Sequence, residues 1–284
     1  MSVQLPSPAI AIVGRHNSGK TTLIEKLIAE LTARGFDVGS IKHHSHADFS
    51  IDYPGKDSYR HRAAGATETI ISAPGQVACV KTIQGERECS ELLRDMPGHD
   101  IVIVEGYRKS GLPTIEIMRS GNDADMKTAR VFAQGAQDRW PLGVDFAQVA
   151  KAVERGEDVE IPIDEKPPGT EETDRIDYGD ISNKMPTAKT VAVVTDIDEA
   201  LEAAESYGIA SFALGDIASL ADYVEEHHVR PRLSIVIQAG GESRRMGQSK
   251  ATVPFAGRPL ISRLVDRIGP VADELTITTN EPEN

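Results

Sequence analysis

One stretch near the N-terminus constrains the fold of this chain more than any other feature. Residues Ala9–Leu23 read AIAIVGRHNSGKTTL. The apolar run Ala9–Val13 predicts a short buried strand, and Gly14–Thr21 matches the pattern G-x-x-x-x-G-K-[ST]. Apolar residues at 23, 24, 27, 28 and 31 then follow the spacing of one helical face. Strand, glycine loop and helix in this order predict a phosphate-binding loop. They also predict an α/β fold of the P-loop NTPase type, with a mostly parallel sheet flanked by helices.

The residue types of this loop fit a nucleotide site that uses magnesium. Its glycines allow backbone N–H groups to curl around phosphates, and the following helix adds the positive end of its dipole. Lys20 is expected to reach the β- and γ-phosphates of the nucleotide, and the Thr21 hydroxyl is expected to ligate Mg²⁺. We therefore interpret this loop as a nucleotide-binding site.

Composition limits the partners of such a site. The 284 residues are enough for two domains, and the formal net charge is −13. A body this acidic argues against a general binder of nucleic acids or anionic membranes, so phosphate binding must be local. Cys79 and Cys89 form no metal-ligand pattern, and the N-terminal sequence lacks the basic start and apolar core of a signal peptide. We therefore expect a cytoplasmic protein that binds neither nucleic acid nor membrane.

Two further apolar runs end on a carboxylate. The run 101–104 predicts a buried parallel strand with Glu105 at its tip, and the run 190–194 predicts another strand that ends at Asp196. P-loop NTPases hold or orient Mg²⁺ and water at such a strand tip, so Glu105 is a candidate magnesium and catalytic residue. Asp196 either accepts N–H donors from a guanine edge or caps its strand. The sequence has no N-K-x-D motif that would decide between them.

A polar segment rich in histidine follows the second predicted strand, which ends at Lys42. His43, His44 and His46 lie within four residues of one another, but no fourth metal ligand is identifiable. Three interpretations therefore stay open for this segment: a metal site, a loop that faces an anion or substrate, and a solvated loop without a role.

The middle of the chain is expected to be less compact. Residues 121–188 are acidic, contain Pro and Gly, and are poor in large apolar side chains. We expect a partly ordered excursion with one helix that starts near Phe146. Elsewhere the pattern predicts a helix from Ser58, a short strand from Thr69 and a strand from Pro113.

Several segments together resemble the molybdopterin-guanine dinucleotide biosynthesis protein B (MobB) family. They read GRHNSGKTTLIEKLI, IKHHSH, DYPGKDSYRHRAAGA, DIVIVEGYRK with PTIEIMRS, AVVTDI and LADYVEEH, and they span residues 8–228 apart from the excursion. The KH segment that leads to PGKDS, and the VEGY segment, are the specific signals, because a P-loop alone indicates only a superfamily. The resemblance implies a P-loop domain over residues 1–230 that binds GTP. Such proteins are usually homodimers with weak GTPase activity that assist the guanylation of molybdopterin.

The resemblance also implies roles for individual residues. Lys20 and Glu105 are the implied catalytic residues, and Thr21 and Glu105 are the implied magnesium ligands. Phosphate contacts are implied for the loop residues Gly14, His16, Asn17, Ser18, Gly19, Lys20, Thr21 and Thr22. The segment around Lys42, His43, Lys56 and Asp57 is implied to belong to the family's characteristic second site. The long insert between Arg119 and Thr190 departs from the family pattern.

A second resemblance lies near the C-terminus, where LSIVIQAGGESRRMGQSKATVPFAGRPLISRLV contains an apolar strand followed by A-G-G-x-S-x-R-M-G. Gly240 and Gly241 let the backbone approach phosphates, and Arg245 and Lys250 can neutralise a triphosphate and its leaving group. This pattern looks like the start of MobA, the molybdenum cofactor guanylyltransferase that transfers GMP from Mg·GTP to molybdopterin. Residues 231–284 are expected to be an incomplete, partly Rossmann-like transferase segment that transfers GMP only if completed. A guanylyltransferase is therefore an expected partner, in cis or in trans.

Two other functions share the same loop. A nickel-enzyme maturation GTPase would use the histidine segment, although Cys-His ligand spacing and N-K-x-D are absent from the sequence. A small-molecule kinase would need an arginine-rich lid and a base beside its acceptor, for which Asp48 or Asp52 is the candidate.

Overall fold

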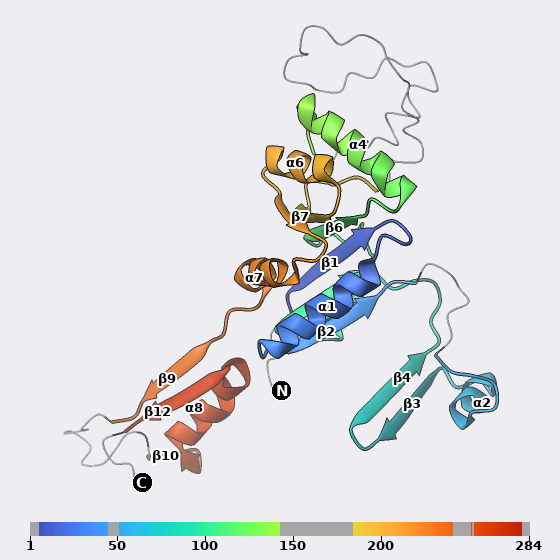
Figure 1. Cartoon of the computed structure of the whole chain (residues 1–284). Coiled ribbons are helices and arrows are strands. Elements are labelled where there is room, and N and C mark those ends of the chain that lie inside the picture. The colour runs from blue at the N-terminus through green and yellow to red at the C-terminus, as the bar shows by residue number, and fades with distance from the viewer. Residues whose placement is uncertain (1–5, 45–50, 143–183, 241–250, 252, 280–284) are drawn as a thin grey trace, which may run out of the picture.

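The centre of the molecule is a six-stranded sheet, seen in a computed structural model that describes residues 6–44, 51–142, 184–240, 251 and 253–279 (Figure 1). The strand order is β2-β5-β1-β6-β7-β8, and each neighbouring pair is parallel. The strands are β1 (Ala9–Gly14), β2 (Val38–Lys42), β5 (Ile101–Glu105), β6 (Thr114–Met118), β7 (Thr190–Thr195) and β8 (Ala210–Ala213). The predicted α/β class is confirmed.

Helices cover both faces of this sheet. They are α1 (Lys20–Ala33), α3 (Cys89–Arg94), α4 (Asp123–Gln137), α6 (Asp198–Ser206) and α7 (Ile217–His228). Successive strand residues point to opposite faces, so Ile10 and Ile12 of β1 pack with α1 and α7, whereas Ala11 and Val13 face the side of α3. On the side of α3, α4 and α6 pack over β7. None of the described helices is long and apolar enough to cross a membrane.

The expectation of a loose excursion over residues 121–188 is wrong for its first part. Residues 123–137 form α4, in which Val131 and Phe132 are at most 2% exposed and belong to the core. Asn122 caps the helix with its side-chain oxygen. Met126, Val131 and Phe132 are the only large apolar side chains of this amphipathic helix, so the segment has a low average hydrophobicity in the sequence. The expected helix near Phe146 lies outside the described residues.

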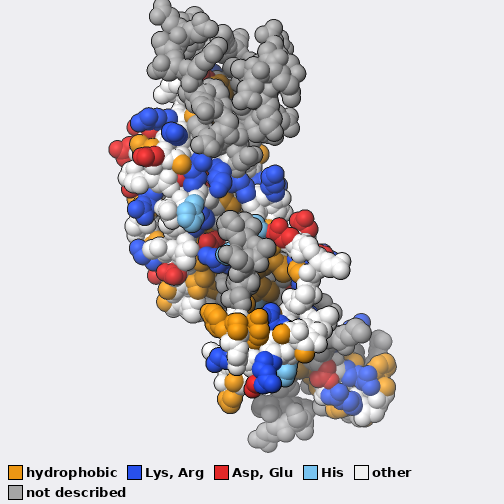
Figure 2. Space-filling model, turned by 90° about the vertical axis from the view of Figure 1, so that its right-hand side faces the viewer, with side chains coloured by type: hydrophobic (Ala, Val, Ile, Leu, Met, Phe, Trp, Pro, Cys, Tyr) orange, Lys and Arg blue, Asp and Glu red, His pale blue; other side chains and the backbone are white. Residues whose placement is uncertain are grey.

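Residues 56–81, between β2 and α3, form an arm that projects from the sheet (Figure 1). The arm consists of α2 (Asp57–Ala63) and an antiparallel hairpin of β3 (Glu68–Ala73) and β4 (Gln76–Lys81). The predicted helix and first strand are confirmed, whereas β4 was not predicted. Ile70 and Val77 of the hairpin are 62% and 71% exposed. Figure 2 views the molecule from the side of this arm and shows hydrophobic side chains on the surface of its lower half.

The chain beyond α7 forms a separate unit that leads away from the sheet (Figure 1). The parallel strands β9 (Ser234–Gln238) and β12 (Glu274–Thr278) form its sheet, and β9 is the strand that the sequence predicted. Helix α8 (Leu260–Ile268) lies between them in the sequence. Short strands β10 (Pro254–Phe255) and β11 (Arg258–Pro259) and a 3-10 turn (Gly269–Val271) complete the described part of this unit.

An ion-pair cluster ties this unit to the N-terminal edge of the central sheet. Nη2 of Arg230 lies 3.1 Å from Oδ1 of Asp100, just before β5, and 2.5 Å from Oδ1 of Asp273, just before β12. The unit therefore starts at the edge opposite the glycine loop, and β9 runs away from that edge (Figure 1). As a result, Gly14 at the end of β1 lies at one edge of the central sheet, and Gly240, just after β9, lies beyond the opposite edge.

Candidate nucleotide-binding site

The glycine loop joins β1 to α1, as predicted, at the carboxyl edge of the sheet. Gly14 packs so closely on β6 that a Cβ atom there would lie 2.6 Å from the carbonyl oxygen of Ile117. Gly19 has a φ of 90° and Asn17 a φ of 62°, in the left-handed region that glycine and asparagine adopt most readily. The loop therefore has a shape that side chains at the glycine positions would disturb.

Four side chains gather where the loop meets the tip of β5. Lys20 Nζ donates hydrogen bonds to two carbonyl oxygens of the loop, at 3.2 and 2.5 Å. The Thr21 hydroxyl donates to the Glu105 carboxylate at 3.3 Å. The Lys42 ammonium pairs with both oxygens of the same carboxylate, at 3.0 and 2.9 Å. The structure thus brings together the two predicted magnesium ligands and two of the predicted cations.

The charge state of Lys20 responds to this setting. Burial lowers the pKa of Lys20 below its ordinary value, and the Glu105 carboxylate opposes that shift. Lys184 and Lys42 lower the pKa further because they are like charges. A phosphate held among these ammonium groups would favour the charged form of Lys20.

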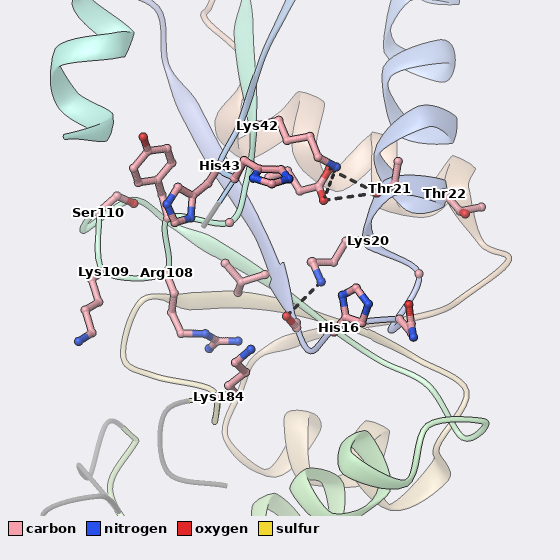
Figure 3. A pocket seen from close by; sticks show the side chains of 18 of the residues that line it. His16, Lys20, Thr21, Thr22, Lys42, His43, Arg108, Lys109, Ser110 and Lys184 are labelled. Atoms are coloured by element: carbon pink, nitrogen blue, oxygen red, sulfur yellow. Dashed lines mark hydrogen bonds and ion pairs between the residues drawn. The ribbon is translucent and has the colours of Figure 1, made fainter. Parts of the chain in front are cut away.

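These side chains line a pocket of about 1300 Å³ (Figure 3). This volume exceeds the range of roughly 300–1,000 Å³ that is common for small-molecule sites. The predicted residues that line it are Gly14, His16, Asn17, Gly19, Lys20, Thr21, Thr22, Lys42, His43 and Glu105. Ser18 is fully buried within the loop.

The pocket carries a local excess of positive charge. Seven cationic side chains line it, namely Lys20, Lys42, Arg87, Arg108, Lys109, Arg119 and Lys184. Three carboxylates, those of Glu86, Glu88 and Glu105, oppose them, which leaves an excess of four positive charges in a chain of net charge −13. Figure 2 shows Lys and Arg side chains gathered on the upper half of the molecule, above the exposed hydrophobic side chains. An acidic body therefore carries a local patch of positive charge, as a local phosphate site requires.

Several predicted residues lie elsewhere. Lys56 and Asp57 stand at the start of α2, on the projecting arm, and do not line the pocket. Asp196 accepts hydrogen bonds from the backbone N–H and the hydroxyl of Ser120, at 2.6 and 2.7 Å. These bonds favour the capping alternative, and the guanine contact of Asp196 stays a prediction. Gly240 belongs to the C-terminal unit. Three further residues, Gly241, Arg245 and Lys250, lie outside the described residues.

The histidine segment borders the pocket without forming a metal site among the described residues. The ring of His43 packs against the ring of Tyr107, with 4.5 Å between centroids, and its Nε2 lies 2.5 Å from a carboxylate oxygen of Glu86. Within the described part of the chain, no group of three or more His, Cys, Asp or Glu side chains could hold a metal ion. His46 lies outside that part.

Sequence reasoning missed the support that α4 gives to the loop. Asp125 is 1% exposed and accepts hydrogen bonds from the Ser18 hydroxyl and the Arg119 backbone N–H, both at 3.1 Å. Arg15 Nε donates to the Thr128 hydroxyl at 2.9 Å. Burial raises the pKa of the Asp125 carboxyl, although its hydrogen bonds oppose the shift. The Asn-Asp pair at 122–123 is a helix-start signal in the sequence, but it does not reveal contact with the loop.

Comparison with known proteins shows the family of this chain. Residues 9–134 match the family "Molybdopterin guanine dinucleotide synthesis protein B". The molybdopterin-guanine dinucleotide biosynthesis adapter protein of Escherichia coli is 38% identical over 118 residues, which are 40% of this chain and 67% of that protein. Its Haemophilus influenzae counterpart is 33% identical over 140 residues, 49% of this chain and 78% of that protein. The chain belongs to the molybdopterin guanine dinucleotide synthesis protein B (MobB) family.

A second match lies beyond the MobB region. Residues 235–284 match the MobA-like NTP transferase domain. The molybdenum cofactor guanylyltransferase of Cereibacter sphaeroides is 48% identical over 50 residues, which are 17% of this chain. The chain spans about a quarter of that protein's length (26%).

Among solved structures, the crystal structure of Bacillus subtilis MobB aligns with a TM-score of 0.48 and 21% identity, covering 79% of this chain and 99% of that one. Both predicted resemblances, to MobB and to the start of MobA, are confirmed.

Proposed function

We propose that this chain is a GTP-binding accessory protein in the synthesis of molybdopterin guanine dinucleotide. Its P-loop domain, residues 1–230, holds GTP and assists the attachment of GMP to molybdopterin. The observation that carries the proposal is the cationic pocket around Lys20, Thr21 and Glu105, in a chain whose relatives are named adapter proteins for this synthesis. The match of residues 235–284 to a MobA-like domain supports the same biosynthetic step.

The residues beside the loop fit a magnesium ion. Mg²⁺ prefers oxygen ligands, and the Thr21 hydroxyl and Glu105 carboxylate supply them 3.3 Å apart at the mouth of the loop. A bound Mg²⁺ would neutralise phosphate charge. Lys42 pairs with both Glu105 oxygens, so it competes with the ion for this carboxylate and is free to turn to a phosphate when the carboxylate binds the ion. Glu105 also stands where it can orient a water molecule, which supports weak GTPase activity.

The arrangement of the chain favours a guanylyltransferase partner in trans. The glycine loop lies at the carboxyl edge of the central sheet, whereas β9, which ends before Gly240, leads away from the opposite edge (Figure 1). The Arg230 cluster holds the C-terminal unit in that arrangement. GTP bound at Lys20 is therefore remote from Gly240, the residue at which the second glycine pattern begins among the described residues. The homodimer implied by the family would cover the exposed Ile70 and Val77 of the arm. Sedimentation velocity of the full chain measures whether the chain forms a dimer.

The kinase alternative gains no support from the described residues. Asp52 is 7% exposed, accepts a hydrogen bond from the Ser58 hydroxyl at 3.0 Å and does not line the pocket. The other candidate base, Asp48, lies outside the described residues.

Calorimetric titration of the full chain with GTP and with ATP tests the guanine assignment. We expect GTP to bind at least about tenfold more tightly than ATP in the presence of Mg²⁺, which corresponds to about 1.4 kcal/mol. Equal affinity for the two nucleotides would contradict the assignment. Titration with GTP after removal of Mg²⁺ serves as the control for the metal, and we expect weaker binding there.

A further inference from the structure

The pocket extends beyond the glycine loop to a second group of cations. Figure 3 shows the side chains of Arg108 and Lys184 close together, on the side of the pocket that Lys20 faces. Arg108 comes from the loop after β5, and Lys184 from the segment just before β7. Lys184 lies outside residues 9–134, the range that matches the MobB family.

The protein core holds this group in place. Glu116 of β6 is 1% exposed and accepts hydrogen bonds from both terminal nitrogens of Arg108. Nη2 lies 2.6 Å from Oε2, and Nη1 donates to Oε1. Nη1 also donates to the carbonyl oxygen of Met185 at 3.0 Å. The Met185 side chain is 6% exposed and packs in the core beside Trp140. The Met185 side chain is buried and its carbonyl oxygen is hydrogen-bonded to Arg108, so the backbone from which Lys184 projects is held in place.

The charges of this group are only partly balanced. Glu116 neutralises the guanidinium of Arg108, which leaves Lys184 with an uncompensated positive charge. The Lys184 ammonium makes no hydrogen bond or ion pair with a described residue. Lys184 is also close enough to Lys20 to lower the pKa of that residue. Two like charges turned toward one space are unfavourable unless an anion lies between them.

We propose that Lys184 and Arg108 form an anion subsite beside the P-loop that binds a phosphate group. The inference rests on the proposed function, because the neighbouring loop is taken to hold the nucleotide. The phosphate belongs either to the end of the bound triphosphate or to a second phosphorylated ligand in the same pocket. Lys184 supplies the net charge, and Arg108 supplies the N–H donors that Glu116 and Met185 leave unused, on Nε and Nη2.

Substitution of Lys184 tests the subsite against a matched control. Lys189→Ala removes the same charge five residues along the same segment, from an exposed side chain that does not line the pocket. Each variant is titrated with GTP and GDP in Mg²⁺. The loss of one charge-assisted contact corresponds to about tenfold in affinity. If the subsite holds the terminal phosphate, Lys184→Ala weakens GTP about tenfold and leaves GDP unchanged. Lys184→Arg restores GTP binding.

A second titration covers the other source of the phosphate. The chain is loaded with a non-hydrolysable GTP analogue and titrated with inorganic phosphate. If the subsite takes a second ligand, Lys184→Ala weakens phosphate binding about tenfold and leaves both nucleotides unchanged. The proposal is overturned if Lys184→Ala matches Lys189→Ala in every titration, or weakens GTP and GDP equally. Titration of the two variants with ATP and ADP tests the subsite in the same way even if the pocket does not prefer guanine.

Discussion

Replacement of Lys20 by alanine should weaken GTP binding by about 100-fold or more. Lys20 is the cation that the loop aims at the β- and γ-phosphates, and hydrogen bonds to charged groups contribute about 1.5–3 kcal/mol each. Hydrogen bonds to two carbonyl oxygens of the loop hold the Lys20 ammonium in place. None of the other cations that line the pocket occupies this position, so none replaces Lys20 in the variant. Isothermal titration calorimetry with Mg·GTP measures the change.

Lys26→Ala is the matched control for this variant, because Lys26 is an exposed lysine in the middle of the same helix. We expect it to bind GTP as the unmodified chain does. Tight GTP binding by Lys20→Ala would instead place the main nucleotide site elsewhere, for example at the second glycine loop.

The pH dependence of binding follows from the same side chain. Burial lowers the pKa of Lys20 below 10.5, so the ammonium loses its proton at a lower pH than an exposed lysine does. GTP affinity should therefore decline as the pH is raised toward 10.5, and this decline should be smaller in Lys20→Ala.

The second large effect is expected from Asp125→Ala, on the helix that supports the loop. Its carboxylate accepts hydrogen bonds from the Ser18 hydroxyl and the Arg119 N–H. The alanine variant leaves the part-buried Arg119 N–H without this acceptor, and the Ser18 hydroxyl keeps only the Arg15 carbonyl oxygen at 2.9 Å. A buried donor without a partner costs about 1–3 kcal/mol. We expect a decrease of about 2 kcal/mol in the free energy of unfolding in urea. GTP affinity should fall about tenfold because the loop loses its fixed position.

Two companion variants separate this role from a general loss of charge. Asp125→Asn keeps an acceptor and should recover most of the stability and affinity. Asp123→Ala removes an exposed carboxylate from the same helical turn and should cost no more than about 1 kcal/mol, through the helix dipole. If Asp125→Ala has the same free energy of unfolding and the same GTP affinity as the unmodified chain, α4 does not position the loop.

The parts of the site that the sequence predicted are those encoded by neighbouring residues. The glycine loop, its helix and the strand tip at Glu105 follow from short patterns, and the parallel sheet then places Thr21 beside Glu105. By contrast, Ser18 and Asp125 are 107 positions apart, and no local pattern indicates their contact. Lys184 follows a polar stretch without periodicity, so its place in the pocket depends on the burial of its neighbour Met185.

The arm shows the converse case. Lys56 and Asp57 belong to a segment that resembles the family, and the resemblance implied a place at a second site together with Lys42 and His43. The structure puts both at the start of α2, on an arm that projects from the sheet and contributes no side chain to the pocket. Family patterns preserve residue types, whereas the distance between an arm and a loop depends on tertiary or quaternary packing.

Formation of molybdopterin guanine dinucleotide in a mixed reaction tests the central claim most directly. A purified molybdenum cofactor guanylyltransferase is incubated with molybdopterin, Mg²⁺ and limiting GTP, with and without the full chain, and the product is measured by mass spectrometry. A reaction without added transferase serves as the control for product that the chain forms itself. We predict that the unmodified chain accelerates product formation and that Lys20→Ala does not. Acceleration by both forms, or by neither, would contradict a role for GTP held at this P-loop.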